Sequence, residues 1–227
     1  MNMKKYLIFN LVFTLASICF AQKDVTKFLG IPVDGTKTAM IQKLKAKGFS
    51  YNAKTDCLKG EFNGQDVEVH VVTNNNKVYR IFVVDAIGVD ESEIKVRFNN
   101  LCKQFEKNEK YVPADLEGRY ELDEKEDISY EMIVNKKRYQ ASYSQLTPSD
   151  IDTTDLQKYA LSQLSIDDVE KMSDKEKMEV MIKLSTEYMV NIMSNKSVWF
   201  MIDEKYGMYY ILMYYDNGYN KADGEDL

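Results

Sequence analysis

The sequence is poor in the residues that most often build metal and catalytic sites. It contains one histidine, three cysteines and one tryptophan among 227 residues. A structural zinc site is excluded, because His70 is the single histidine and no C-x-x-C pair accompanies it. The motifs of phosphate-binding loops, dinucleotide sites, zinc proteases, nucleophile elbows and papain-like proteases are missing as well. We therefore expect no metal, no cofactor and no enzymatic activity.

Basic residues are also fewer than acidic ones. The chain has 30 basic and 36 acidic residues, a formal net charge of −6. Nucleic-acid affinity depends on Lys and Arg neutralising phosphates, so a nucleic-acid partner is not expected. Apolar types make up 44% and charged types 29% of the residues, which is ordinary globular composition. The length allows one large or two small domains, and it leaves the oligomeric state open.

The N-terminus has the three-part pattern of a secretory signal peptide. Lys4 and Lys5 precede an apolar run over residues 6–20, and small residues at Cys19 and Ala21 form a cleavage site. The run is shorter than the roughly 20 residues of a membrane span, which disfavours an uncleaved anchor. Ile18 stands where a lipoprotein signal needs a small residue, which disfavours lipidation of Cys19. We predict cleavage after Ala21, a periplasmic or secreted protein and no membrane span after cleavage.

Two cysteines, Cys57 and Cys102, remain in the predicted mature chain. In an oxidising compartment such a pair can form a disulfide. The alternative is that both are small, buried, apolar side chains. The sequence leaves this choice open.

Helices and short strands alternate along the chain. Residues 36–47 and 91–107 have helical apolar spacing, with start signals at Thr36 and Asp90. Asn63-Gly64 indicates a tight hairpin. A helical region over residues 155–193 is expected to break at Ser173, where a capping box begins. Strands are predicted over residues 57–62, 67–73, 78–85, 116–122, 128–134, 138–144, 197–202 and 206–215, with a turn over residues 203–205.

One module recurs in this order of elements. The pattern L-x-G-x-aromatic appears at residues 58–62 and again at 116–120, each time after a helix and before a hairpin. This predicts an internal duplication. We expect an α+β fold of two tandem helix-plus-meander units over residues 22–146 and a third helix–hairpin unit over 147–216. A mobile acidic tail is expected over residues 217–227.

Tandem helix-plus-meander units behind a signal peptide resemble the beta-lactamase-inhibitor-protein-like fold. They are also similar to the small SmpA-type outer-membrane-assembly lipoproteins of Gram-negative bacteria. The resemblance implies that antiparallel strands carry helices on one face and that the other face or its loops bind another protein. It rests on element order and the repeated motif, and it assigns no role to a numbered residue.

Tyrosines crowd the last predicted strand. Alternation places Tyr209, Ile211, Met213 and Tyr215 on one face and Tyr210, Leu212 and Tyr214 on the other. If helices cover the first face, the second is open and rich in the residue types that dominate binding interfaces. The alternatives are a strand buried on both faces, or rings lying flat with wet hydroxyls. The residues proposed for the open face are Arg80, Phe82, Gln140, Ser142, Trp199, Tyr210 and Tyr214.

Two other features have simpler interpretations. His70 shares the outward side of its strand with Glu68 and is expected to be a solvated sheet residue. Several of the 12 methionines lie on one side of the late helix. They suggest an adaptable binding groove or, more simply, core filling.

Three functional hypotheses follow. The first is a non-catalytic protein-binding module, an inhibitor or envelope adaptor, whose partner is another envelope or extracellular protein. The second is a carrier or sensor of a small apolar or glycan ligand. The third is a carboxylate-based hydrolase, which requires a cleft with two close acids and a perturbed pKa.

Overall fold

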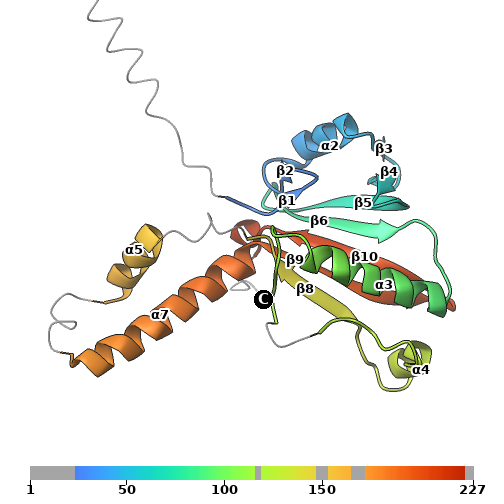
Figure 1. The fold of residues 1–227 in the computed structure, drawn as a ribbon. Helices are drawn as coiled ribbons and strands as arrows, with labels where there is room; N and C mark the ends of the chain where they lie inside the picture. Colours follow the sequence, from blue (N-terminus) through green and yellow to red (C-terminus); the bar gives the residue numbers. More distant parts are fainter. Residues whose placement is uncertain (1–23, 116–118, 147–152, 165–171, 223–227) are drawn as a thin grey trace, which may run out of the picture.

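The computed structural model describes residues 24–115, 119–146, 153–164 and 172–222. Over these residues the fold is α+β, with an eight-stranded antiparallel sheet and a separate two-stranded hairpin (Figure 1). The order of the large sheet is β3-β4-β5-β6-β10-β9-β8-β7. The strands are β1 (Lys27–Phe28), β2 (Ile31–Pro32), β3 (Ser50–Asn52), β4 (Cys57–Phe62), β5 (Gln65–Asn74), β6 (Lys77–Asp85), β7 (Val112–Pro113), β8 (Gln140–Ser144), β9 (Ser197–Lys205) and β10 (Met208–Asp216).

Three helices begin at the capping residues that the sequence indicates. Thr36 caps α2 (Lys37–Ala46) and Asp90 caps α3 (Glu91–Glu106), each by accepting a backbone hydrogen bond. Ser173 and Glu176 form a reciprocal capping box at the start of α7 (Asp174–Asn195). The remaining helices are α4 (Ile128–Ile133), α5 (Thr153–Gln163) and the 3-10 turn η2 (Gly218–Asn220).

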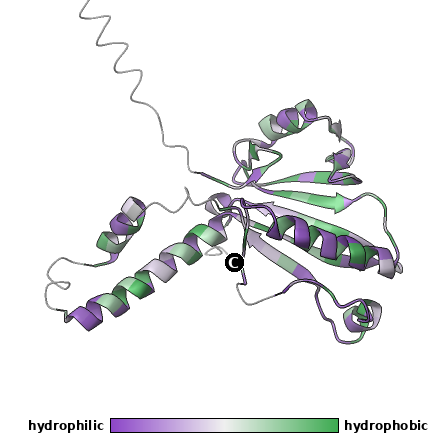
Figure 2. Cartoon of the chain, viewed as in Figure 1, coloured by the Kyte–Doolittle hydropathy of each residue, from purple (hydrophilic) through white to green (hydrophobic). Residues whose placement is uncertain are grey.

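Helices α2 and α3 cover the same face of the sheet, each over different strands. α2 packs on β5 and β6, and α3 packs on β10 and β9 (Figure 1). Alternate strand residues point toward these helices and form one buried apolar cluster. Figure 2 shows that β6 is mostly apolar. Its members include Val69, Ile81, Phe98, Phe200 and Ile211. The opposite face of the central strands carries no described helix.

The last two long strands complete the middle of the sheet. β10 pairs with β6, and β9 pairs with β8, so both lie between strands that precede them in the sequence. The predicted third unit therefore shares a sheet with the first two. The turn between β9 and β10 is not the predicted 203–205 segment. It is formed by Tyr206 and Gly207, whose φ angles of 55° and 75° suit a two-residue hairpin.

The predicted strand over residues 128–134 is wrong. These residues form α4, because the Asp127 side chain accepts a hydrogen bond from the Tyr130 backbone and caps a helix there. Glu91 of α3 also accepts from Ile128 N at 3.1 Å and fixes this start. Of the predicted strand over 116–122, residues 116–118 lie outside the described residues and 119–122 form no strand. Among the described residues of the predicted second unit, β7 and β8 join the sheet.

Residues 217–222, the start of the predicted mobile tail, contact the rest of the chain. Asn217 is 1% exposed and donates through Nδ2 to the Val33 carbonyl at 2.8 Å. Asn220 donates to Asp34 and to the Val78 carbonyl, each at 2.8 Å. These bonds join the segment to β6 and to the loop that follows β2. Residues 223–227 lie outside the described residues.

The predicted signal peptide, residues 1–21, also lies outside the described residues. Within the described part of the chain, every helix is too short or too polar to cross a bilayer.

Candidate functional site

An aromatic row crosses the face of the sheet that the helices leave open. The strand register places His70 opposite Phe82, Phe82 opposite Tyr214, and Tyr214 opposite Trp199. These four residues lie on β5, β6, β10 and β9, which are consecutive in the sheet. We call them the aromatic row.

The rings of the aromatic row are stacked on one another. Centroids are 5.6 Å apart for His70 and Phe82, 4.7 Å for Phe82 and Tyr214, and 3.9 Å for Tyr214 and Trp199. The corresponding interplanar angles are 29°, 16° and 14°. Rings stacked across strands stand upright on the sheet, because each plane faces its neighbour along the row. The ring edges are therefore exposed to solvent, whereas most ring faces are covered by a neighbouring ring of the row.

An ion pair fixes one side of the row. Arg80 donates to Asp216 through Nε at 2.6 Å and through Nη2 at 2.7 Å. Trp199 donates from Nε1 to the same carboxylate at 3.2 Å, and the Arg80 guanidinium lies 4.9 Å from the centre of the Tyr214 ring. Burial raises the pKa of Tyr214, so its phenol is a neutral hydrogen-bond donor. Two rings of the row are thus held by charge-assisted contacts as well as by stacking.

The seven residues proposed from the sequence all lie on the open side of their strands. Arg80, Phe82, Ser142, Trp199, Tyr210 and Tyr214 are half-buried and Gln140 is exposed. Ser142 stands opposite Trp199 and extends the row by one strand, and Gln140 stands opposite Met201. Tyr210 lies apart from the row, with its ring against Gly88.

Sequence reasoning missed part of this surface. The sequence predicts that His70 is a solvated sheet residue; in the structure it is half-buried and its ring ends the aromatic row. Val84, Leu212 and Met201 form a parallel apolar row, because Leu212 pairs with both Val84 and Met201. Alternation places each of them on the open face of its own strand. Their alignment depends on strand register, which is not readable from one strand.

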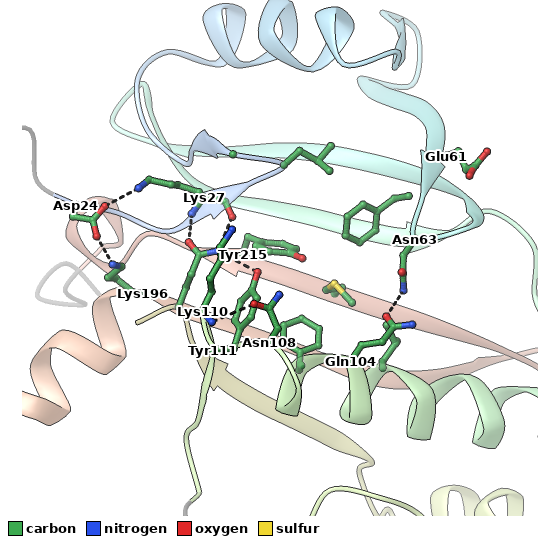
Figure 3. Close-up of a pocket in the computed structure, with 17 residues that line it drawn as sticks. Asp24, Lys27, Glu61, Asn63, Gln104, Asn108, Lys110, Tyr111, Lys196 and Tyr215 are labelled. Atoms are coloured by element: carbon green, nitrogen blue, oxygen red, sulfur yellow. Dashed lines mark hydrogen bonds and ion pairs between the residues drawn. The ribbon is translucent and has the colours of Figure 1, made fainter. Parts of the chain in front are cut away.

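A groove lies on the other face, between the β1–β2 and β4 layer and α3 (Figure 3). Its volume is about 810 Å³, and its floor includes the buried residues Phe105, Met213 and Tyr215. The Asn63 amide donates to Gln104 at 3.0 Å and joins the hairpin turn to α3 across it.

Polar side chains line the rim of this groove. Asp24 pairs with Lys27 at 3.1 Å and with Lys196 at one end, near Lys110. The other carboxylate of the lining, Glu61, lies at the opposite end in Figure 3. The groove therefore lacks the two close acids that hydrolysis by paired carboxylates requires. Among the described residues, no cluster of three or more His, Cys, Asp or Glu could hold a metal ion.

A disulfide between Cys57 and Cys102 is not formed: both thiols are free and buried. Cys57 begins β4, whereas the Cys102 thiol on α3 interacts with Tyr143 of β8. Five strand-to-strand steps separate β4 from β8, a distance on the order of 20 Å. A bridge needs Cα atoms within about 7 Å. Burial raises the pKa of the Cys102 thiol to about 12, so it is a neutral core residue.

The chain matches no protein-family model, and searches of curated proteins and of solved structures find no match either.

Proposed function

We propose that the protein is a non-catalytic binding module of the cell envelope or its exterior, and that the open sheet face binds another protein. The aromatic row is the observation that carries this proposal. An uncovered face with stacked His, Phe, Tyr and Trp side chains is the kind of surface that marks a contact site. The predicted signal peptide supports the location.

The open face has the composition of an interface with an apolar centre and a polar rim. The aromatic row and the row of Val84, Leu212 and Met201 run side by side in the middle. The rim carries Gln140 and the ion pair of Lys59 with Glu68, at 2.8 Å. Tyr, Trp and Arg supply much of the binding energy at interfaces when partner residues exclude water around them.

Stacking also prepares these side chains for binding. A ring that lies between two others, or under a guanidinium, has few rotamers left to lose when a partner arrives. Ordering a rotamer-rich side chain costs about 0.5–1.5 kcal/mol, and this row avoids most of that cost. An open surface of pre-ordered side chains suits a folded protein better than a small molecule, which binds where a cavity encloses it.

The exposed ring edges define the chemistry of the partner. Aromatic edges carry partial positive charge, and the Tyr210 and Tyr214 hydroxyls are donors. The partner surface should therefore combine an apolar centre with carbonyl or carboxylate oxygens around it. A sugar ligand fits this surface less well. Sugars stack on exposed ring faces, and in the aromatic row neighbouring rings cover most of the ring faces.

The test compares retention by matched variants. Immobilised wild-type protein, Tyr210→Ala with Tyr214→Ala, and Tyr130→Ala with Tyr206→Ala are each incubated with envelope extract, and bound proteins are quantified by mass spectrometry. Tyr130 and Tyr206 are 54% and 91% exposed and lie off the open face. We expect a protein whose retention falls at least tenfold only in the first variant. Equal retention by both variants, or no selectively retained protein, would contradict the proposal.

The groove of Figure 3 favours a second candidate, a carrier or sensor of a small ligand. Its volume of about 810 Å³ lies within the usual range of ligand sites. Its amides and three lysines suit an acidic glycan better than an apolar ligand. Side-chain amide NMR signals of Asn63, Gln104 and Asn108 should shift when an oligouronate is added. Unchanged signals at millimolar oligouronate, beside a control titration with the neutral oligosaccharide, would remove this candidate.

A further inference from the structure

The sequence contains the pair Asn-Gly twice, at Asn63-Gly64 and at Asn217-Gly218. Asparagine is a chemically labile residue. It is most labile before glycine, because a residue without a Cβ atom lets its own nitrogen approach the asparagine side chain. The two pairs have the same covalent chemistry, so a difference in their reactivity comes from the fold.

The first pair lies in open surroundings. Asn63 and Gly64 form the turn between β4 and β5, and both residues are exposed. Their φ angles are 53° and 74°, and a Cβ atom built on Gly64 would meet nothing within 4 Å. Phe62 and Gln65 form the last pair of the ladder, so the Gly64 nitrogen lies outside the strand pairing. The turn therefore leaves space for a ring to close between Asn63 and Gly64.

The second pair is enclosed. Asn217 is 1% exposed, and its Nδ2 donates to the Val33 carbonyl at 2.8 Å. Its Oδ1 accepts from Tyr219 N at 3.1 Å. A Cβ atom on Gly218 would lie 2.5 Å from Oδ1 of Asn195, so this glycine packs against the end of α7. Both ends of the Asn217 amide are thus held in place, away from water.

We propose that Asn63 is a site of spontaneous deamidation and that the fold protects Asn217 from the same reaction. The Gly64 nitrogen gives its proton to solvent and attacks Cγ of Asn63. The new N–C bond closes a five-membered succinimide, and the bond from Cγ to Nδ2 breaks as ammonia leaves with a proton from solvent. Water then opens the ring at either carbonyl and leaves aspartate or isoaspartate at position 63. The reaction needs water alone, which an exposed turn supplies.

The reaction changes a contact between the hairpin turn and α3. Asn63 Nδ2 donates to Gln104 Oε1 at 3.0 Å across the groove (Figure 3). The same two residues line a second hollow of about 610 Å³ along α3. Their hydrogen bond therefore lies where the two hollows meet.

Both products of deamidation weaken this contact. A carboxylate in place of the Asn63 amide has no proton to donate to Gln104 Oε1. Isoaspartate also adds one carbon to the backbone of a two-residue turn, whose length sets the register of β4 and β5. Deamidation should therefore release the turn from α3 and join the two hollows.

The first test compares the two pairs in one sample of the full chain. The protein is incubated at mildly alkaline pH in buffer or in urea, and deamidation at each pair is followed by peptide mass spectrometry. In urea the two pairs should react at similar rates. In buffer we expect Asn63 to react at least tenfold faster than Asn217, and no more than tenfold slower than in urea. A smaller difference between the pairs in buffer, or stronger protection of Asn63 by the fold, would overturn the proposal.

The second test follows the contact with Gln104. Asn63→Gln is the matched control, because it keeps an amide donor but would have to close a six-membered ring, which forms far more slowly. Side-chain amide NMR signals of Gln104 are recorded before and after incubation of the wild type and of this variant. We expect a second set of Gln104 signals in the incubated wild type, in proportion to the converted Asn63, and none in Asn63→Gln. Converted Asn63 with unchanged Gln104 signals, or equal changes in both samples, would overturn the effect on this contact.

Discussion

Arg80 and Asp216 face each other on β6 and β10, joined by hydrogen bonds of 2.6 and 2.7 Å. The pair lies at the boundary where the last strand of the chain joins the N-terminal meander. It also supports the aromatic row, because Asp216 accepts from Trp199 and Arg80 lies over Tyr214. One ion pair therefore contributes both to the closure of the sheet and to the proposed binding face.

Removing the arginine should destabilise the fold. In Arg80→Met the carboxylate of Asp216, whose side chain is 11% exposed, loses its guanidinium partner while remaining in the sheet. We expect a loss of about 2 kcal/mol in the free energy of unfolding, measured by urea titration with far-UV circular dichroism. Lys59→Met, which removes a solvent-exposed ion pair with Glu68, should change little. Equal effects of the two variants would show that the Arg80 pair has no special role.

Acidification should favour the folded state through Asp85. Burial raises the pKa of this carboxyl group, although it accepts from Ile211 N at 2.9 Å and pairs with Arg97. The folded protein therefore holds this proton at a higher pH than the unfolded chain, and the Asp85 contribution to stability rises as pH falls from 7 toward 4. That contribution is lost again as pH rises through the folded pKa.

The Asp85 effect is isolated by comparison with Asp85→Asn. Glu126 acts in the opposite direction, because Lys137 and Tyr139 lower its pKa and its contribution is lost in acid. Urea titrations from pH 4 to 8 should show the wild type gaining stability relative to Asp85→Asn as the pH falls. A difference that stays constant or reverses would contradict the assignment.

Gly60 explains one half of the repeated L-x-G-x-aromatic motif. A Cβ atom at this position would lie 2.7 Å from Cδ1 of Phe49, whose ring packs over the strand. Gly60→Ala should therefore cost about 1–3 kcal/mol of stability by overpacking. In a Phe49→Leu background, where the ring is gone, the same substitution should cost clearly less. An equal loss of stability in both backgrounds would show that contact with the Phe49 ring is not its cause.

The two free thiols should resist modification in the folded protein. Cys57 and Cys102 are buried, and the pKa of Cys102 is raised to about 12, so almost none of it is thiolate at pH 8. Iodoacetamide labelling followed by peptide mass spectrometry should be at least a hundredfold slower at Cys102 in buffer than in urea. Rapid labelling of the native protein would show that α3 opens readily from the sheet.

Local signals allowed much of the fold to be predicted. Thr36, Asp90 and Ser173 each cap the helix that the sequence indicated, and Asn63-Gly64 forms the hairpin turn with φ of 53° and 74°. These features depend on neighbours within a few residues. The alternation of β10 also placed Tyr210 and Tyr214 on the face away from the helices.

The rest depends on contacts distant in the sequence. Alternating Ile128, Tyr130 and Met132 resemble a strand, but a cap at Asp127 and contacts from α3 make this segment helical. The pairing of β10 with β6 joins residues more than 125 positions apart and is not encoded in either strand alone. The aromatic row could not be predicted from the sequence for the same reason, because Phe82 and Tyr214 stack only when β6 and β10 pair in this register.

Site-specific photo-crosslinking tests the proposed binding face most directly. Benzoylphenylalanine replaces Phe82 in the aromatic row or, as control, Tyr130 on α4, in the cells that produce the protein. Irradiation should join the Phe82 derivative to one protein, and this adduct should be missing for the Tyr130 derivative and lost when Tyr210→Ala and Tyr214→Ala are added. Adducts of equal yield at both positions, or none at position 82, would contradict a partner on the open face.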